Sequence, residues 1–128
     1  MTTRRGFSLV ELLTVIVVIA ILAAIVIPRF VQSRERAVTA MLQADLRYLA
    51  TLQEVYWNEH RVYAGAAGDL DFEASEGVVV TFAAADRDGW GATAAHPGTP
   101  VTCAFYVGSA TPVAPATGTG APECAEVP

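Results

Sequence analysis

Lysine is missing from this chain of 128 residues, and all eight of its basic side chains are arginines. Aspartate and glutamate together number 13, so the net charge is −5 at neutral pH. A protein that binds nucleic acid needs a basic face that neutralises phosphates. The charge balance therefore argues against nucleic-acid binding through a basic patch.

Patterns that would indicate catalysis are also missing. The chain has two histidines, His60 and His96, and they lie far apart in the sequence. No G-x-S-x-G motif surrounds a serine, and neither cysteine has a histidine partner in its sequence context. We expect one surface histidine and one turn histidine, no catalytic residue, no cofactor, and a protein that is not an enzyme.

What the chain does have is a long apolar run near its N-terminus. From Phe7 to Ile27, the only polar side chains are those of Ser8, Glu11 and Thr14. As a helix, this run would be about 31 Å long, which is enough to cross a bilayer. Residues 15–19 are all β-branched and in water would indicate a buried strand, but in lipid every backbone group must bond internally, so we predict a helix.

Three interpretations of this run compete. A secretory signal peptide would be followed by an A-x-A-like cleavage site, but Pro28 and Arg29 follow instead. Residues 3–8 are similar to a twin-arginine export signal, but the run is too apolar, lacks a cleavage site and contains Glu11. The third interpretation is a retained membrane anchor, which we favour. Arginines flank both ends of the run, so charge alone leaves its topology open.

Glu11 is a carboxylate in a segment where an unpaired charge is costly. Ionisable residues in membrane-spanning segments are functional by default, and they usually have a partner. The alternative is that the Glu11 side chain only reaches the lipid headgroup region.

A family resemblance lies in residues 4–13, which read Arg-Arg-Gly-Phe-Ser-Leu-Val-Glu-Leu-Leu. This segment resembles the class III signal of type IV pilins and type II secretion pseudopilins, in which a short basic leader ends in Gly and Glu is the fifth residue after the cut. The resemblance implies that a prepilin peptidase cuts between Gly6 and Phe7 on the cytoplasmic side and that the new Phe7 amine is N-methylated. Residues 1–6 would be the leader peptide, and residues 7–28 would form the transmembrane and filament-core helix.

The resemblance also gives Glu11 a partner. Cleavage after Gly6 would create a charged amine on Phe7, about one helical turn from the Glu11 carboxylate of the same or a neighbouring chain. If subunits stack their apolar helices, each Glu11 can neutralise an adjacent Phe7 amine and set the axial register. Gly6, which has no Cβ, permits close approach of the peptidase. Pro28 matches the family's helix-kinking proline and cannot donate a hydrogen bond, so we predict a kink or local opening there.

After Pro28 the pattern becomes amphipathic. Apolar side chains recur at spacings of three and four residues: Val38, Met41, Leu42, Leu46, Leu49, Leu52 and Tyr56. Gln43 and Gln53 are among the polar residues that we place on the other faces, and we expect the helix to extend to about Trp57 or Glu59. Four aromatic residues cluster near its end: Tyr48, Tyr56, Trp57 and Tyr63. Core packing and interface anchoring explain these aromatics more simply than an electron path does.

An acidic segment follows at residues 69–76. Its alternating oxygen-bearing side chains resemble a calcium loop: Asp69, Asp71, Glu73 and Ser75. The EF-hand pattern fails, because Ala74 stands where its glycine belongs and Val80 where its bidentate glutamate belongs. We interpret the segment as a solvated loop without a metal.

Three strand candidates follow, at residues 78–82, 91–95 and 101–107, and turn signals separate them. They predict a three-stranded antiparallel meander, after which residues 108–122 form an extended loop. Cys103 and Cys124 flank this loop, and in a chain with a membrane-targeting segment they favour a disulfide over a metal site or two free thiols. Closing this loop of roughly 20 residues would stabilise the fold by about 3 kcal/mol.

The expected fold is therefore α+β and pilin-like. The first half of a long N-terminal helix spans the membrane, and its amphipathic second half packs on the sheet as part of a headgroup formed by residues 29–128. The resemblance implies a structural subunit of a type IV pilus-like surface filament used for adhesion, twitching motility or DNA uptake. The alternative within the family is a pseudopilin of a type II secretion system.

The resemblance also implies partners and a location. The partners would be other copies in a helical filament, the prepilin peptidase and methyltransferase, an assembly platform and minor pilins. The precursor would cross the bacterial inner membrane once and then enter an extracellular filament or a periplasmic pseudopilus. A minor pilin, or a membrane-anchored binding domain that never polymerises, stays open as a further alternative.

Overall fold

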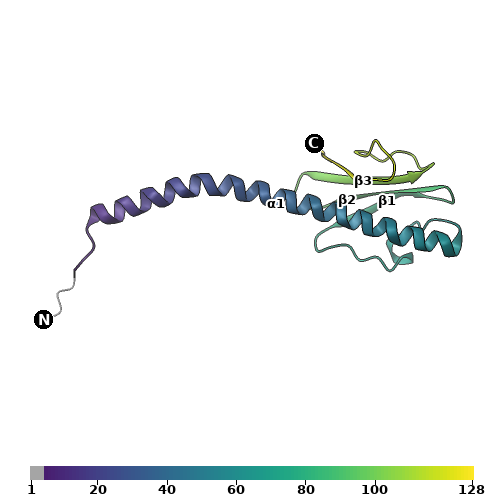
Figure 1. The fold of residues 1–128 in the computed structure, drawn as a ribbon, viewed down its shortest axis with the longest axis horizontal. Helices are drawn as coiled ribbons and strands as arrows, with labels where there is room; N and C mark the ends of the chain where they lie inside the picture. Colours follow the sequence, from purple (N-terminus) through teal and green to yellow (C-terminus); the bar gives the residue numbers. More distant parts are fainter. Residues whose placement is uncertain (1–4) are drawn as a thin grey trace. The chain divides into compact units, whose positions relative to one another are not determined.

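A computed structural model describes residues 5–128. Arg4 and the rest of residues 1–4, which belong to the predicted leader, lie outside this range. The elements are α1 (Leu9–His60), a short 3-10 helix η1 (Ala67–Asp69), β1 (Val79–Ala85), β2 (Gly89–Ala95), β3 (Val101–Gly108) and β4 (Glu123–Glu126) (Figure 1). The chain divides into two compact units, one ending at Arg34 and one beginning at Glu35.

The first unit consists mainly of the N-terminal part of α1. Among residues 5–128, α1 is the one helix that is long and apolar enough to cross a membrane. Its N-terminal apolar window is entirely unburied. The helix continues through Pro28, and the kink predicted at that residue stays a prediction.

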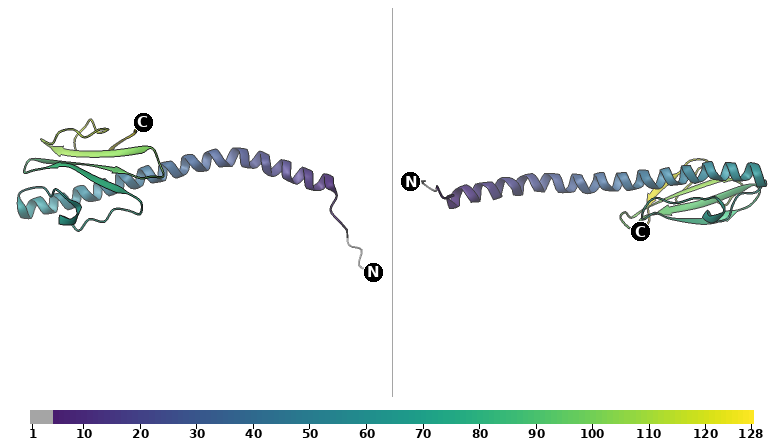
Figure 2. Two further views of the ribbon diagram at one scale, coloured as in Figure 1. Left: turned by 180° about the vertical axis from the view of Figure 1, so that it is seen from behind. Right: turned by 90° about the horizontal axis from the view of Figure 1, so that it is seen from below.

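The second unit packs the C-terminal part of α1 against a sheet (Figure 2). The buried face of the helix recurs every three or four residues: Leu42, Asp45, Leu46, Leu49 and Gln53. Its leucines contact Trp90 and Phe105 on β2 and β3 in one hydrophobic core. Burying each such leucine contributes roughly 1.5–3 kcal/mol, so this stripe fixes the helix to the sheet.

The sheet is antiparallel with strand order β1-β2-β3-β4. The prediction of three strands was wrong, because β4 adds a fourth strand beside β3. β4 has only four residues and two of them are glutamates, so it shows neither the length nor the alternation that identifies a strand in sequence. The first two strands also extend beyond their predicted ends, to Ala85 and back to Gly89.

The segment between β3 and β4 packs against the face of the sheet opposite α1. Ala104 and Tyr106 of β3 form a second small core with Ala116, and Val113 packs beside it. At Gly91 on β2, an added Cβ would lie 2.8 Å from Cγ2 of Val113. A larger residue at this position would force Val113 to shift, so glycine lets the segment approach the sheet closely.

Candidate functional site at the N-terminal helix and in the headgroup

Ser8 and Glu11 bond each other reciprocally at the start of α1. The backbone N–H of Ser8 donates to Oε2 of Glu11 at 2.8 Å, and the backbone N–H of Glu11 donates to Oγ of Ser8 at 3.2 Å. This arrangement is a capping box, which satisfies two of the unpaired N–H groups at a helix N-terminus. The role of Ser8 was missed at the sequence level, although Ser-x-x-Glu before an apolar run is its signature.

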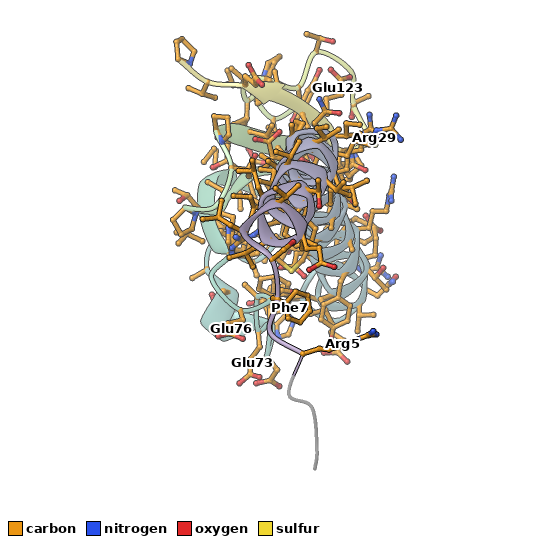
Figure 3. The ribbon with its side chains drawn as sticks, turned by 90° about the vertical axis from the view of Figure 1, so that its left-hand side faces the viewer. Arg5, Phe7, Arg29, Glu73, Glu76 and Glu123 are labelled. Atoms are coloured by element: carbon orange, nitrogen blue, oxygen red, sulfur yellow. A yellow bond between two sulfur atoms is a disulfide. The ribbon has the colours of Figure 1, made fainter. Side chains whose placement is uncertain are left out.

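The capping box leaves much of the Glu11 carboxylate available. An ionised carboxylate offers about four acceptor positions, and the Ser8 amide occupies one of them. The structure gathers Arg5, Gly6, Phe7 and Glu11 around a shallow hollow of about 170 Å³. Phe7 is 87% exposed, and its side chain lies near the start of α1 (Figure 3). The residues predicted for processing and for assembly thus lie together.

A continuous apolar surface follows along α1. Its large side chains from Leu9 to Val31 are roughly half exposed or more, with values from 49% at Val15 to 81% at Leu9. Soluble monomers rarely leave apolar patches larger than a few hundred Å² exposed. This surface therefore requires a covering, which must be lipid or other apolar helices.

Two buried polar side chains of α1 hold the connection that follows the helix. The Gln53 amide donates from Nε2 to the Ala64 carbonyl at 2.8 Å and accepts from the Ala64 N–H at 2.8 Å. Gln53 is fully buried, so its placement on another face was wrong. Its two partners lie after the helix end, and such a long-range pair leaves no periodic signal in the sequence.

Asp45 anchors the acidic loop in the same way. Its carboxylate accepts from the backbone N–H of Ser75 and from the Ser75 hydroxyl, both at 2.8 Å. Asp45 is buried, with only 8% of its surface exposed. The serine of the apparent calcium pattern thus serves as a donor to the helix.

The aromatic residues near the end of α1 make packing contacts and hydrogen bonds. The rings of Tyr56 and His60 are stacked at 4.0 Å, and Nε1 of Trp57 donates to the Arg87 carbonyl at 3.0 Å. Burial raises the pKa of Tyr63, and the nearby charge of Glu54 raises it further. The rings of Trp57 and Tyr63 also pair, with centroids 6.3 Å apart. These aromatic side chains thus have structural contacts, as core packing and anchoring predict. His96 lies beyond β2, where its Nδ1 accepts from the Gly98 N–H at 2.8 Å.

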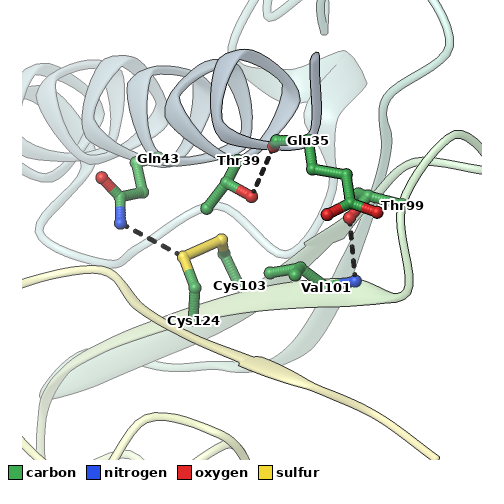
Figure 4. Close-up of a disulfide and its surroundings, with 7 residues drawn as sticks. All are labelled: Glu35, Thr39, Gln43, Thr99, Val101, Cys103 and Cys124. Carbon is green, nitrogen blue, oxygen red and sulfur yellow. Dashed lines mark hydrogen bonds between the residues drawn. A yellow bond between two sulfur atoms is a disulfide. The ribbon is translucent and has the colours of Figure 1, made fainter. Parts of the chain in front are cut away.

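Cys103 and Cys124 are joined by a disulfide (Figure 4). They are direct partners in the register of β3 and β4, with 4.0 Å between their Cα atoms. From α1, Nε2 of Gln43 donates to Sγ of Cys124 at 3.3 Å. The disulfide therefore holds the short strand β4 on the sheet, and the hydrogen bond from Gln43 joins β4 to the helix.

Glu123, next to the disulfide, holds the segment between β3 and β4 through hydrogen bonds. Its carboxylate accepts from the Thr117 N–H, the Thr117 hydroxyl and the Gly118 N–H, each at 2.8 Å. These bonds, led by the one from the Thr117 N–H, lower the pKa of Glu123. Tyr106 adds a bond from its hydroxyl to the Thr117 carbonyl at 3.0 Å. The segment predicted as an extended loop is thus fixed on the sheet.

Comparison with known proteins finds matches to parts of this chain. Residues 1–27 match the family described as the prokaryotic N-terminal methylation motif. Over 74 residues the chain is 36% identical to the type IV major pilin protein PilA of Myxococcus xanthus, a match that covers 58% of this chain and 34% of that protein. Over 63 residues it is 41% identical to the type IV wide pilus major component PilA4 of Thermus thermophilus, a match that covers 49% of this chain and 48% of that protein.

A third relative is a secretion protein. The chain is 27% identical over 68 residues to the type II secretion system core protein G of Pseudomonas aeruginosa, a match that covers 53% of this chain and 48% of that protein. Residues 1–27 thus carry the N-terminal methylation motif, and over about half of its length the chain is similar to two type IV major pilins and to a type II secretion core protein. As in the expected pilin-like fold, a long N-terminal helix packs through its second half on an antiparallel sheet.

These similarities support a pilin-type filament subunit. The matched regions span between about a third and a half of these relatives' own lengths. The methylation motif and the apolar N-terminal part of α1 fit a precursor anchored in a membrane that later enters a filament.

Proposed function

We propose that this protein is the structural subunit of a type IV pilus-like surface filament used for adhesion, twitching motility or DNA uptake. The observation that carries the proposal is the exposed apolar surface of α1 with one carboxylate, Glu11, near its start. The apolar surface of such a helix can be covered first by lipid and then by the helices of neighbouring subunits, because lipid tails and these helices are both apolar. The protein would be a single-pass precursor in the inner membrane and then an extracellular filament subunit.

Processing precedes assembly in this proposal. A prepilin peptidase removes residues 1–6 by cutting between Gly6 and Phe7, and the Phe7 amine is N-methylated. Gly6 supports this step, because an added Cβ would find no atom within 4 Å and the backbone is open to an enzyme. Residues 7–28 then form the membrane and filament-core helix, and residues 29–128 form the headgroup.

The capping box sets the starting point for assembly. Glu11 is bonded to the Ser8 N–H before any neighbour arrives. Its remaining acceptor positions can then take the charged Phe7 amine of an adjacent copy. A charge pair in an apolar helix bundle is costly to break, so one axial register between copies is favoured.

A pseudopilin of a type II secretion system is the second candidate. It is supported by the similarity to core protein G. That similarity is weaker, at 27% identity, than the 36% and 41% identity to the two major pilins, so the pseudopilin ranks second. A deletion strain separates the candidates. Loss of surface filaments with normal protein secretion supports the pilus, and accumulation of secreted proteins in the periplasm with filaments intact supports the pseudopilus.

The direct test combines filament isolation with analysis of the mature N-terminus. Filaments sheared from cells, examined by electron microscopy and mass spectrometry, should contain a chain that begins with N-methyl-Phe7. Glu11→Ala should leave the protein in the membrane and sharply reduce its entry into filaments, while Glu76→Ala, which removes an exposed carboxylate from the headgroup, should assemble normally. Unchanged incorporation of Glu11→Ala would refute the proposed role of this charge in assembly.

A further inference from the structure

Arginines and carboxylates are segregated along the chain. Residues 29–36 hold three arginines, Arg29, Arg34 and Arg36, and one acid, Glu35, so this segment has a net charge of +2. Residues 37–128 hold three arginines and eleven carboxylates, a net charge of −8. One copy therefore carries both a basic segment and an acidic headgroup.

The basic segment also has an apolar component. Phe30 is 68% exposed and Val31 is 50% exposed, and the three arginines are exposed as well. Phe30 and Arg34 are four residues apart on α1, so they lie on the same face of the helix. This face presents an aromatic ring beside a guanidinium group.

A groove in the headgroup has the complementary chemistry. It runs between the C-terminal turns of α1 and the segment that contains η1, as two adjoining hollows of about 310 and 500 Å³ that share Tyr48 and Asp71. Its apolar side includes Val55, which is 54% exposed, and Tyr48, which is 51% exposed. Four carboxylates line the same two hollows: Glu59, Asp69, Asp71 and Glu73.

We propose that residues 29–36 of one copy dock in this headgroup groove of a second copy. The proposal rests on the proposed filament function. Phe30 would contact the apolar side of the groove, and the arginines would face its carboxylates. Exposed ion pairs contribute little affinity singly, but complementary charges fix the register and exclude wrong partners.

The position of the groove along α1 determines the axial displacement between two copies that are joined by this docking. Arg36 and Glu59 are 23 residues apart on α1, which corresponds to about 35 Å along the helix. Docking therefore joins parallel copies displaced by about that distance, whereas pairing of Glu11 with Phe7 needs a displacement of only about 6 Å. The two contacts involve different neighbours. Each is heterologous, and repeated heterologous contacts generate an open helical array.

The absence of lysine allows a direct test. Arg34→Lys keeps the positive charge and introduces the only lysine of the chain. In sheared filaments, a carbodiimide joins an amine to a contacting carboxylate through an amide bond, and the carbodiimide takes up the oxygen that is lost and becomes a urea. Mass spectrometry should find the introduced lysine linked to Glu59, Asp69, Asp71 or Glu73 in filaments, and this link should be lost from detergent-dispersed monomers.

Controls separate this inference from the proposed function. Arg29→Lys provides a second, independent reporter at the same segment, and its lysine should link to the same carboxylates. Arg87→Lys, in the turn between β1 and β2, should give no link to the groove. If the lysines introduced at positions 29 and 34 link only to other carboxylates, or link equally in dispersed monomers, the docking is overturned and the filament stands. A wild-type protein that forms no filament at all would instead overturn the proposed function.

Discussion

Gln53→Ala offers a quantitative test of how the headgroup is held together. The substitution removes both bonds to Ala64 and leaves a buried N–H and a buried carbonyl without partners. Leaving a buried polar group unsatisfied costs about 1–3 kcal/mol, so the two groups together imply a loss of roughly 2–6 kcal/mol in the free energy of unfolding. A fully buried side chain also leaves a cavity, which places the expected loss toward the upper part of that range.

The assay is urea denaturation of the full chain in detergent, followed by tryptophan fluorescence in a Trp57→Phe background, so that the signal comes from Trp90, which is fully buried in the core. Thr51→Ala is the matched control, because it removes an exposed side chain from the same helix and only a local bond to the Arg47 carbonyl. We expect the control to change stability by less than about 0.5 kcal/mol. A loss below about 1 kcal/mol for Gln53→Ala would refute the inference that this amide holds the segment after the helix.

Three further predictions concern the two ends of the chain. Ser8→Ala removes one half of the capping box, so amide hydrogen exchange in the first turn of α1 should become faster; unchanged exchange would contradict the cap. The pKa of Glu123 is lowered below its ordinary value of 4.5 by its hydrogen bonds, so its contribution to stability is present above that value and is lost as the pH falls through the lower, folded-state pKa. Glu123→Gln should therefore weaken this pH dependence, measured as the change in urea midpoint between neutral and acidic pH. An equal decline of the midpoint in the wild type and in Glu123→Gln would argue against a stabilising role for the hydrogen bonds of Glu123. Replacing Cys103 and Cys124 by serine should lower the free energy of unfolding by about 3 kcal/mol, with the reduced wild type as the comparison; a change within error would show that β4 is held without the disulfide.

Local sequence signals predicted the N-terminal half of the molecule and the order of its elements. The apolar run, the methylation motif and the amphipathic stripe after Pro28 depend on residues close in sequence, so they are readable without a structure. The buried roles of Asp45 and Gln53 depend on partners 30 and 11 residues away, and a polar residue within an apolar stripe resembles an ordinary surface position. β4 was missed for a related reason, because its pairing with β3 substitutes for the apolar alternation that a longer strand would show.

The capping box has a consequence for subunits that are not in a filament. Its donor to Glu11 is the Ser8 amide, and a cut after Gly6 would leave that amide intact. A mature subunit would then return to the membrane with its carboxylate still bonded within its own chain. Under the proposed function, such a subunit would wait in the membrane without a neighbour and could be used again, so the same helix start would serve both growth and disassembly of a filament.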